Sequence, residues 1–106
     1  MKLFTKAILK ALPPLYANDG KKPEEVKVPL KLFNPCGAAT WYITEYSPET
    51  NEGYGLCDLG YGGEMGYVSI SELQALRLPF GLGIERDISW DMNTKLSDVR
   101  AKHPAY

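Results

Sequence analysis

The sequence predicts an α+β fold, in which a four- or five-stranded antiparallel meander sheet carries two or three short helices. The centre of the chain, residues 39–70, is dense in β-branched and aromatic residues, which favour strands. Glycines and prolines interrupt this region at short intervals, as the tight turns of a meander require. Short helical patterns stand before and after it. With 106 residues, the chain is expected to form a single domain over residues 1–106.

Three segments carry the signals of short helices. Residues 6–12 place apolar side chains at helical spacing behind an expected N-cap at Thr5. Ser69 or Ser71 is expected to cap a second helix, because a glutamate three residues after Ser69 completes a capping box. Thr94 is the expected cap of a last short helix.

The strands are expected in the centre of the chain. They cover residues 26–33, 39–46, 54–59 and 65–70, and a weaker fifth candidate covers residues 84–90. Pro29 suggests that the first strand lies at an edge of the sheet, because proline cannot donate to a ladder. In the second strand, the period of two places Glu45 on the same face as Trp41 and Ile43.

Charge is segregated along the chain, although the net charge is only −1. Residues 1–44 contain seven lysines and three acids, whereas residues 45–91 contain two arginines and nine acids. Residues 92–106 are again weakly basic, with three bases and one acid. Such asymmetry bears on the choice of partner rather than on the fold.

Several classes of protein are disfavoured. No run of apolar residues is long enough to cross a membrane. Lys6 and Lys10 interrupt the apolar N-terminal stretch, so a signal peptide is not expected and the predicted location is cytoplasmic. Cys36 and Cys57 are expected to be reduced thiols. No phosphate-binding glycine motif occurs, and we expect no metal and no cofactor.

An enzyme remains an alternative interpretation. A carboxylate-based or metal-dependent enzyme could use two or more acids of the centre and its flank, which are Glu45, Asp58, Glu64, Glu85 and Asp87. A pair of a nucleophile and a histidine is available only if His103 reaches inward, since it is the single histidine. We therefore expect no catalytic residues.

The acids and tyrosines of the central region are the candidates for binding a partner. Tyr61 is the strongest single candidate, because it lies in a turn and cannot easily be buried. The expected partner-binding residues are Glu45, Glu49, Glu52, Asp58, Tyr61 and Glu64. Carboxylates can take the place of phosphates in a basic groove, so we expect a protein partner, in its sharpest form a nucleic-acid-binding complex. Direct binding of nucleic acid or of a membrane is not expected.

The triplet Glu85, Arg86 and Asp87 is expected to be a structural charged cluster. Charged residues in a strand often secure the edge of a sheet. Arg86 is expected to form a bidentate ion pair with Asp58 or Glu64.

Several separated blocks of sequence resemble one known family. The blocks, in order along the chain, are Leu12-Pro13-Pro14-Leu15-Tyr16-Ala17, Thr40-Trp41-Tyr42-Ile43-Thr44-Glu45, Gly55-Leu56, Glu64-Met65-Gly66-Tyr67-Val68-Ser69, Glu72-Leu73 and Gly81-Leu82-Gly83-Ile84-Glu85-Arg86-Asp87. The pattern covers about residues 3–98 and resembles the domain-of-unknown-function family 2958. The resemblance implies a small protein of plasmids, integrative elements or phages, and it implies no activity, cofactor or catalytic residue.

The residues and the resemblance together favour a non-enzymatic binding protein of a mobile genetic element. Its sharpest form is an inhibitor of a host defence complex, of the restriction or CRISPR type, that acts through an acidic, tyrosine-rich face. Besides the enzyme described above, a second alternative is an accessory module of unknown role that binds an element-encoded partner or self-associates. A dimer through an edge strand at residues 26–33 would favour it.

Overall fold

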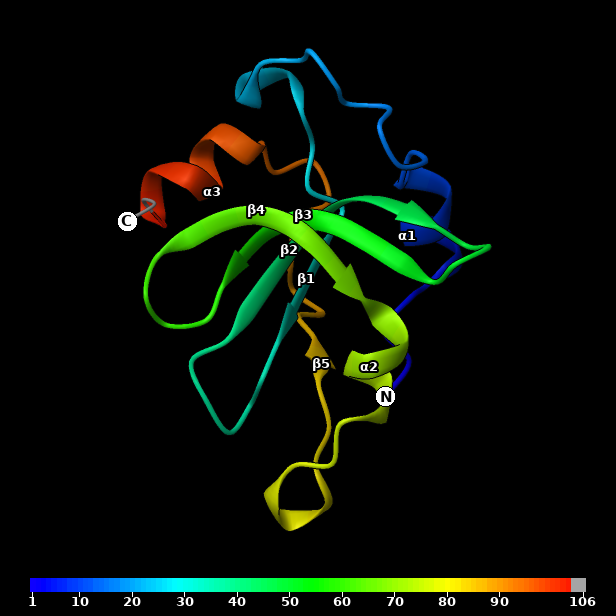
Figure 1. Cartoon of the computed structure of the whole chain (residues 1–106), viewed down its shortest axis with the longest axis vertical. Coiled ribbons are helices and arrows are strands. Elements are labelled where there is room, and N and C mark those ends of the chain that lie inside the picture. The colour runs from blue at the N-terminus through cyan, green and yellow to red at the C-terminus, as the bar shows by residue number, and fades with distance from the viewer. Residues whose placement is uncertain (104–106) are drawn as a thin grey trace.

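The structure, a computed structural model, describes residues 1–103 and is an α+β fold on one open antiparallel sheet (Figure 1). The five strands are β1 (Leu30–Phe33), β2 (Thr40–Ser47), β3 (Glu52–Asp58), β4 (Gly63–Ser69) and β5 (Glu85–Arg86). Their order across the sheet is β4-β3-β2-β1-β5, so the first four form a meander. The predicted fold class is confirmed.

The first strand is internal, and the prediction that it lies at an edge is wrong. β1 pairs with β2 on one side and with β5 on the other. Pro29 stands just before the strand, where no ladder donor is needed, so it does not exclude a central position. The edges are β4 and β5, and self-association through β1 would require the displacement of β5. β5 itself has only two residues, fewer than the predicted 84–90.

The three helices are short, and two of their caps are as predicted. They are α1 (Lys6–Ala11), α2 (Ile70–Ala75) and α3 (Leu96–Lys102). The hydroxyl of Thr5 accepts from the backbone nitrogen of Ile8 at 3.1 Å, and that of Ser69 accepts from Glu72 at 3.2 Å. The predicted cap at Thr94 is wrong, because its hydroxyl donates to the carbonyl of Asp91 instead.

A β-bulge in β2 changes the predicted alternation of its side chains. The register between β2 and β3 shifts between Ile43 and Glu45. The extra residue lets Tyr46 join Trp41 and Ile43 in one core. The prediction that Glu45 shares a face with these residues is therefore wrong.

Each face of the sheet carries a hydrophobic core. One core lies against α1 and α2 and comprises Leu3, Ile8, Leu12, Leu30, Leu32, Trp41, Ile43, Tyr46, Ile70, Leu73 and Ile84. The other lies against α3 and comprises Val26, Val28, Tyr42, Leu56, Leu96 and Val99. Figure 1 shows α3 on one side of the sheet and α2 on the other. Most residues of the edge strand β4 stay partly or fully exposed.

Both cysteines, Cys36 and Cys57, are free thiols, as expected. None of the helices within residues 1–103 combines the length and the apolar composition that a membrane span requires.

Candidate functional site

A chain of hydrogen bonds links Asp58, His103 and Tyr42. Nδ1 of His103 lies 2.7 Å from Oδ2 of Asp58, and Nε2 of the same ring lies 2.8 Å from the hydroxyl of Tyr42. Tyr42 belongs to β2, Asp58 ends β3, and His103 directly follows α3. Residues that are 45 and 61 positions apart thus meet in one line of polar groups.

The turn between β3 and β4 makes this arrangement possible. Oδ1 of Asp58 accepts from the backbone nitrogen of Gly60 at 2.7 Å, which directs Oδ2 toward the imidazole. Gly63 lets the end of α3 approach the sheet, because a Cβ atom there would lie 2.7 Å from the carbonyl oxygen of His103. The glycines of this turn therefore serve the site as well as the hairpin.

Electrostatics determine which groups donate and which accept in the hydrogen bonds between Asp58, His103 and Tyr42. The backbone N–H of Gly60, followed by the hydrogen bond from His103, lowers the pKa of Asp58 below its ordinary value. Asp58 is therefore a carboxylate that only accepts, and Nδ1 of His103 donates to it. In a neutral ring Nε2 then accepts from the hydroxyl of Tyr42. Burial, followed by the charges of Asp58 and Asp87, raises the pKa of Tyr42, so the phenol keeps its proton.

A cavity of about 380 Å³ lies beside this chain of hydrogen bonds. Its lining residues are Lys31, Tyr42, Trp90, Thr94, Asp98, Val99, Lys102 and His103. The rings of Tyr42 and Trp90 have their centroids 5.6 Å apart and form an aromatic wall. The indole nitrogen of Trp90 donates to the carbonyl of Val28 at 2.7 Å, which fixes that ring. The cavity is large enough for a small molecule.

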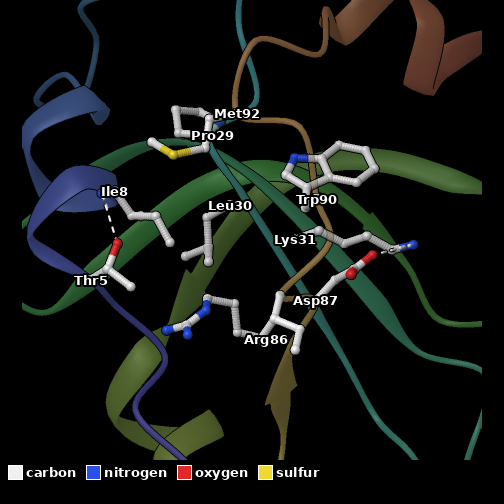
Figure 2. Close-up of a pocket in the computed structure, with 10 residues that line it drawn as sticks. Thr5, Ile8, Pro29, Leu30, Lys31, Arg86, Asp87, Trp90 and Met92 are labelled. Atoms are coloured by element: carbon white, nitrogen blue, oxygen red, sulfur yellow. Dashed lines mark hydrogen bonds and ion pairs between the residues drawn. The ribbon is translucent and has the colours of Figure 1, made fainter.

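Lys31 extends along Trp90 toward Asp87, as Figure 2 shows. Its Nζ atom lies 3.5 Å from Oδ2 of Asp87 and 5.3 Å and 5.7 Å from the ring centroids of Trp90 and Tyr42. Such distances allow a cation–π attraction. Lys31 and Trp90 also line a smaller cavity of about 180 Å³ (Figure 2).

Glu45 is not available to a partner, and its expected role needs correction. Its side chain is 3% exposed. Its two carboxylate oxygens accept from the backbone nitrogens of Tyr16 at 2.7 Å and Asn18 at 3.1 Å. The bulge in β2 turns this side chain toward the loop that follows α1. Glu45 therefore secures that loop.

The remaining acids among the expected partner-binding residues do not form one cluster. Glu49 and Glu52 lie at the hairpin between β2 and β3, whereas Asp58 and Glu64 lie at the opposite end of β3. The length of β3 separates the two ends by roughly 20 Å. The carboxylate of Asp58 is occupied by Gly60 and His103. Within residues 1–103, no group of three or more metal-ligating side chains forms a candidate metal site.

Tyr61 projects from the turn between β3 and β4, where it is 74% exposed. It lines a groove of about 350 Å³ together with Leu59, Glu64 and Tyr67. Leu59 and Tyr67 are also exposed, at 58% and 52%. The groove therefore gathers three large, exposed apolar side chains and one carboxylate along the edge strand β4.

The triplet of residues 85–87 has local contacts. Nη1 of Arg86 donates to the carbonyl of Lys2 at 2.8 Å, and the expected pairing of Arg86 with Asp58 or Glu64 is wrong. Asp87 pairs with Lys31 at 3.5 Å, and Glu85 stands opposite Phe33 in the ladder between β5 and β1. The physical reason is distance, since β5 lies at the opposite edge of the sheet from β4.

Sequence reasoning missed the role of Tyr42 and named His103 only as a conditional partner. The useful signal was that His103 is the only histidine, yet no local pattern indicates which residue such a side chain meets. Phe80 was also missed. It is 96% exposed, with a φ of 62°, in the short 3₁₀ turn Pro79–Gly81.

Comparison with known proteins assigns the protein to a family and gives no match to an individual protein. No curated protein and no solved structure matches the chain. The model of the family described as "Protein of unknown function (DUF2958)" matches residues 3–103, which is nearly the whole chain. This match agrees with the resemblance seen in the sequence, and the chain belongs to the DUF2958 family.

Proposed function

We propose that this protein is a non-enzymatic binding protein of a mobile genetic element, and that its partner belongs to a nucleic-acid-binding complex. In its sharpest form the proposal is an inhibitor of a host defence complex of the restriction or CRISPR type. The family resemblance supports the origin, because its members are typically encoded on plasmids, integrative elements and phages. The groove along β4 supports the binding role.

The observation that carries the proposal is the gathering of Leu59, Tyr61 and Tyr67 in that groove. Exposed apolar side chains are ordinary when scattered, whereas a contiguous patch is typical of an interaction site. Tyrosine is enriched among the residues that dominate binding energy. β4 is also an edge strand, so its outer backbone groups are free to meet a partner.

Carboxylates lie near both ends of β4. Glu64 lines the groove itself. At the other end, Glu52 stands opposite Ser69 in the ladder, and Glu49 lies in the adjacent hairpin. Lysines and arginines of a nucleic-acid-binding groove would meet these acids in place of phosphates, which favours fast and salt-sensitive association. A partner with a basic groove therefore fits this edge best.

The test is capture of partners from a host lysate with the tagged protein, at low and at high salt. We expect to capture a nucleic-acid-binding protein at low salt and to lose it at high salt, because salt screens exposed charge pairs. Duplex DNA should also displace this partner, because the DNA phosphates compete with the carboxylates for its basic groove. The double variant Tyr61→Ala/Tyr67→Ala should lose the partner, and Glu49→Lys/Glu52→Lys/Glu64→Lys should capture it more weakly.

Phe80→Ala is the control, because it removes an even more exposed ring from a loop outside the groove. Loss of the partner in Phe80→Ala with retention in Tyr61→Ala/Tyr67→Ala would place the interface elsewhere. A partner that resists both salt and DNA would overturn the mimicry of phosphates.

A further inference from the structure

We propose that the cavity beside Tyr42 and His103 binds a small planar anion, and that binding takes up one proton onto His103. The ligand class is a flat ring that carries an acidic oxygen, such as an aromatic carboxylate or a nucleotide phosphate. The proposal concerns a different surface from the β4 groove and does not depend on the proposed function.

The geometry leaves Tyr42 as the hydrogen-bonding group that meets the ligand. Both ring nitrogens of His103 are engaged, one by Asp58 at 2.7 Å and one by the Tyr42 hydroxyl at 2.8 Å. Tyr42 and His103 both line the cavity. While the imidazole of His103 is neutral, the hydroxyl of Tyr42 donates its proton to Nε2 and presents only lone pairs to the cavity. An anionic oxygen would meet repulsion from it in this state.

A proton on His103 reverses the polarity of this hydroxyl. Nε2 of the charged ring donates to Tyr42, whose own O–H is then free to turn to the ligand. The carboxylate of Asp58 stabilises the imidazolium on its other side. The arriving anion and the incoming proton therefore favour each other, and the proton comes from solvent. Binding should be tighter at low pH as a consequence.

Charged groups from four parts of the fold surround the cavity beside His103. Asp58 comes from β3, Lys31 from β1, Asp87 from the segment after β5, and Asp98 and Lys102 from α3. Lys31 is held between Asp87 and the aromatic wall. Asp98 and Lys102 are one helical turn apart, so their charges can offset one another, and Lys102 is exposed.

The shape of the cavity selects the rest of the ligand. Trp90 is partly exposed and provides the accessible ring of the aromatic wall, on which a flat ring can stack, while Tyr42 is buried beside it at a tilt of 52°. Lys31, which is paired with Asp87, and Lys102, one helical turn from Asp98, bring ammonium groups to the lining, and the proton taken up by His103 adds the positive charge that favours an anion. The volume of about 380 Å³ suits a single ring system with one acidic group.

The test follows the ring of His103, which is the only histidine and so needs no assignment. Protein labelled with ¹⁵N-histidine is titrated by NMR with benzoate, adenosine monophosphate and inorganic phosphate, once at acidic and once at mildly basic pH. We expect a saturable change in which Nε2 moves toward its protonated signal. Calorimetry in two buffers of different ionisation enthalpy should detect uptake of one proton.

Two variants separate binding from a structural role. Tyr42→Phe keeps the aromatic wall and should weaken binding about tenfold, as expected for one hydrogen bond to a charged group. Tyr46→Phe is its matched control, because Tyr46 is also a buried, hydrogen-bonded tyrosine of β2 but belongs to the opposite core. Lys102→Gln changes an exposed side chain and should weaken binding without unfolding.

Each outcome of these experiments either supports or overturns the proposed binding of an anion. Binding of benzoate alone or of adenosine monophosphate alone identifies the carboxylate or the phosphate as the source of the anion. No saturable change of the His103 signals with either ligand at millimolar concentration overturns the proposal. The proposal is also overturned if inorganic phosphate binds as tightly as adenosine monophosphate. Binding without proton uptake, or equal affinity in wild type, Tyr42→Phe and Lys102→Gln, would overturn it as well.

Discussion

The carboxylate of Glu45 in β2 holds the backbone of Tyr16, whose nitrogen donates to Oε1 at 2.7 Å. Tyr16 has a φ of 73°, in the left-handed region that costs a non-glycine residue roughly 1–2 kcal/mol. Oε2 accepts from Asn18, so one buried side chain supports two backbone groups of this turn. A conformation that is unfavourable locally is thereby stabilised by a residue from the sheet.

Glu45→Ala should lower the free energy of unfolding by about 2 kcal/mol or more, because two backbone donors lose their acceptor. Unfolding by urea, followed by tryptophan fluorescence, measures the change. Glu49→Ala is the control, since Glu49 is exposed and its loss should stay within about 0.5 kcal/mol. Equal midpoints for the two variants would show that Glu45 does not support the turn.

Gly55→Ala should destabilise the protein far more than Gly66→Ala, although the two glycines face each other across β3 and β4. A Cβ atom at Gly55 would lie 1.9 Å from the carbonyl oxygen of Tyr42, whereas one at Gly66 meets nothing within 4 Å. We expect a loss of roughly 3 kcal/mol or more for the first and less than about 1 kcal/mol for the second. Thermal unfolding of both variants provides the comparison, and a Gly55→Ala protein as stable as Gly66→Ala would contradict the close approach of β2 and β3.

Asp58 should make stability sensitive to acid. Gly60 and His103 lower its pKa in the folded state, so its contribution is present above the ordinary aspartate pKa of about 4 and is lost as pH falls through the lowered value. The difference in urea midpoint between wild type and Asp58→Asn should therefore be present above the ordinary aspartate pKa of about 4 and shrink as pH falls below it. The other carboxylates titrate in both proteins and cancel in this difference. A difference that does not change with pH would rule out the lowered pKa.

The phenol of Tyr67 should ionise at an unusually high pH. The hydroxyl of Tyr16 beside it contributes most to a pKa raised to about 12. Tyr16→Phe should return the pKa of Tyr67 toward 10, which ¹³C NMR of the labelled phenol carbons can follow. Tyr61→Phe should leave the pKa of Tyr67 unchanged, and an equal effect of the two variants would exclude a specific contribution from Tyr16.

The sequence predicted the meander and two caps because these depend on neighbours in the chain. β-Branched and aromatic residues marked β2, and Thr5 and Ser69 cap the helices that follow them. The bulge after Ile43 was not predictable from alternation, because an inserted residue leaves no mark in composition. That one residue moved Glu45 from its expected position into a buried structural role.

The candidate site depends on contacts that no local pattern encodes. His103 could have met any of several carboxylates, and the choice of Asp58 follows from the path of α3 across the sheet. The exposure of Tyr61 was predictable, because a glycine-rich turn offers no core to enter. The position of Tyr67 across the groove from Tyr61 was not predictable, because it depends on the register of β3 and β4.

The anchoring of α3 by His103 has a kinetic consequence. Contacts of the meander join strands that are adjacent in sequence, so we expect them to form early, whereas those of His103 bridge 45 and 61 positions and close large loops. Such long closures are expected to form late and to open first under native conditions. Amide hydrogen exchange should therefore be faster in α3 than in β2 and β3. A ligand bound beside Tyr42 would slow that opening, so occupancy of the cavity should be measurable as slower amide exchange in α3.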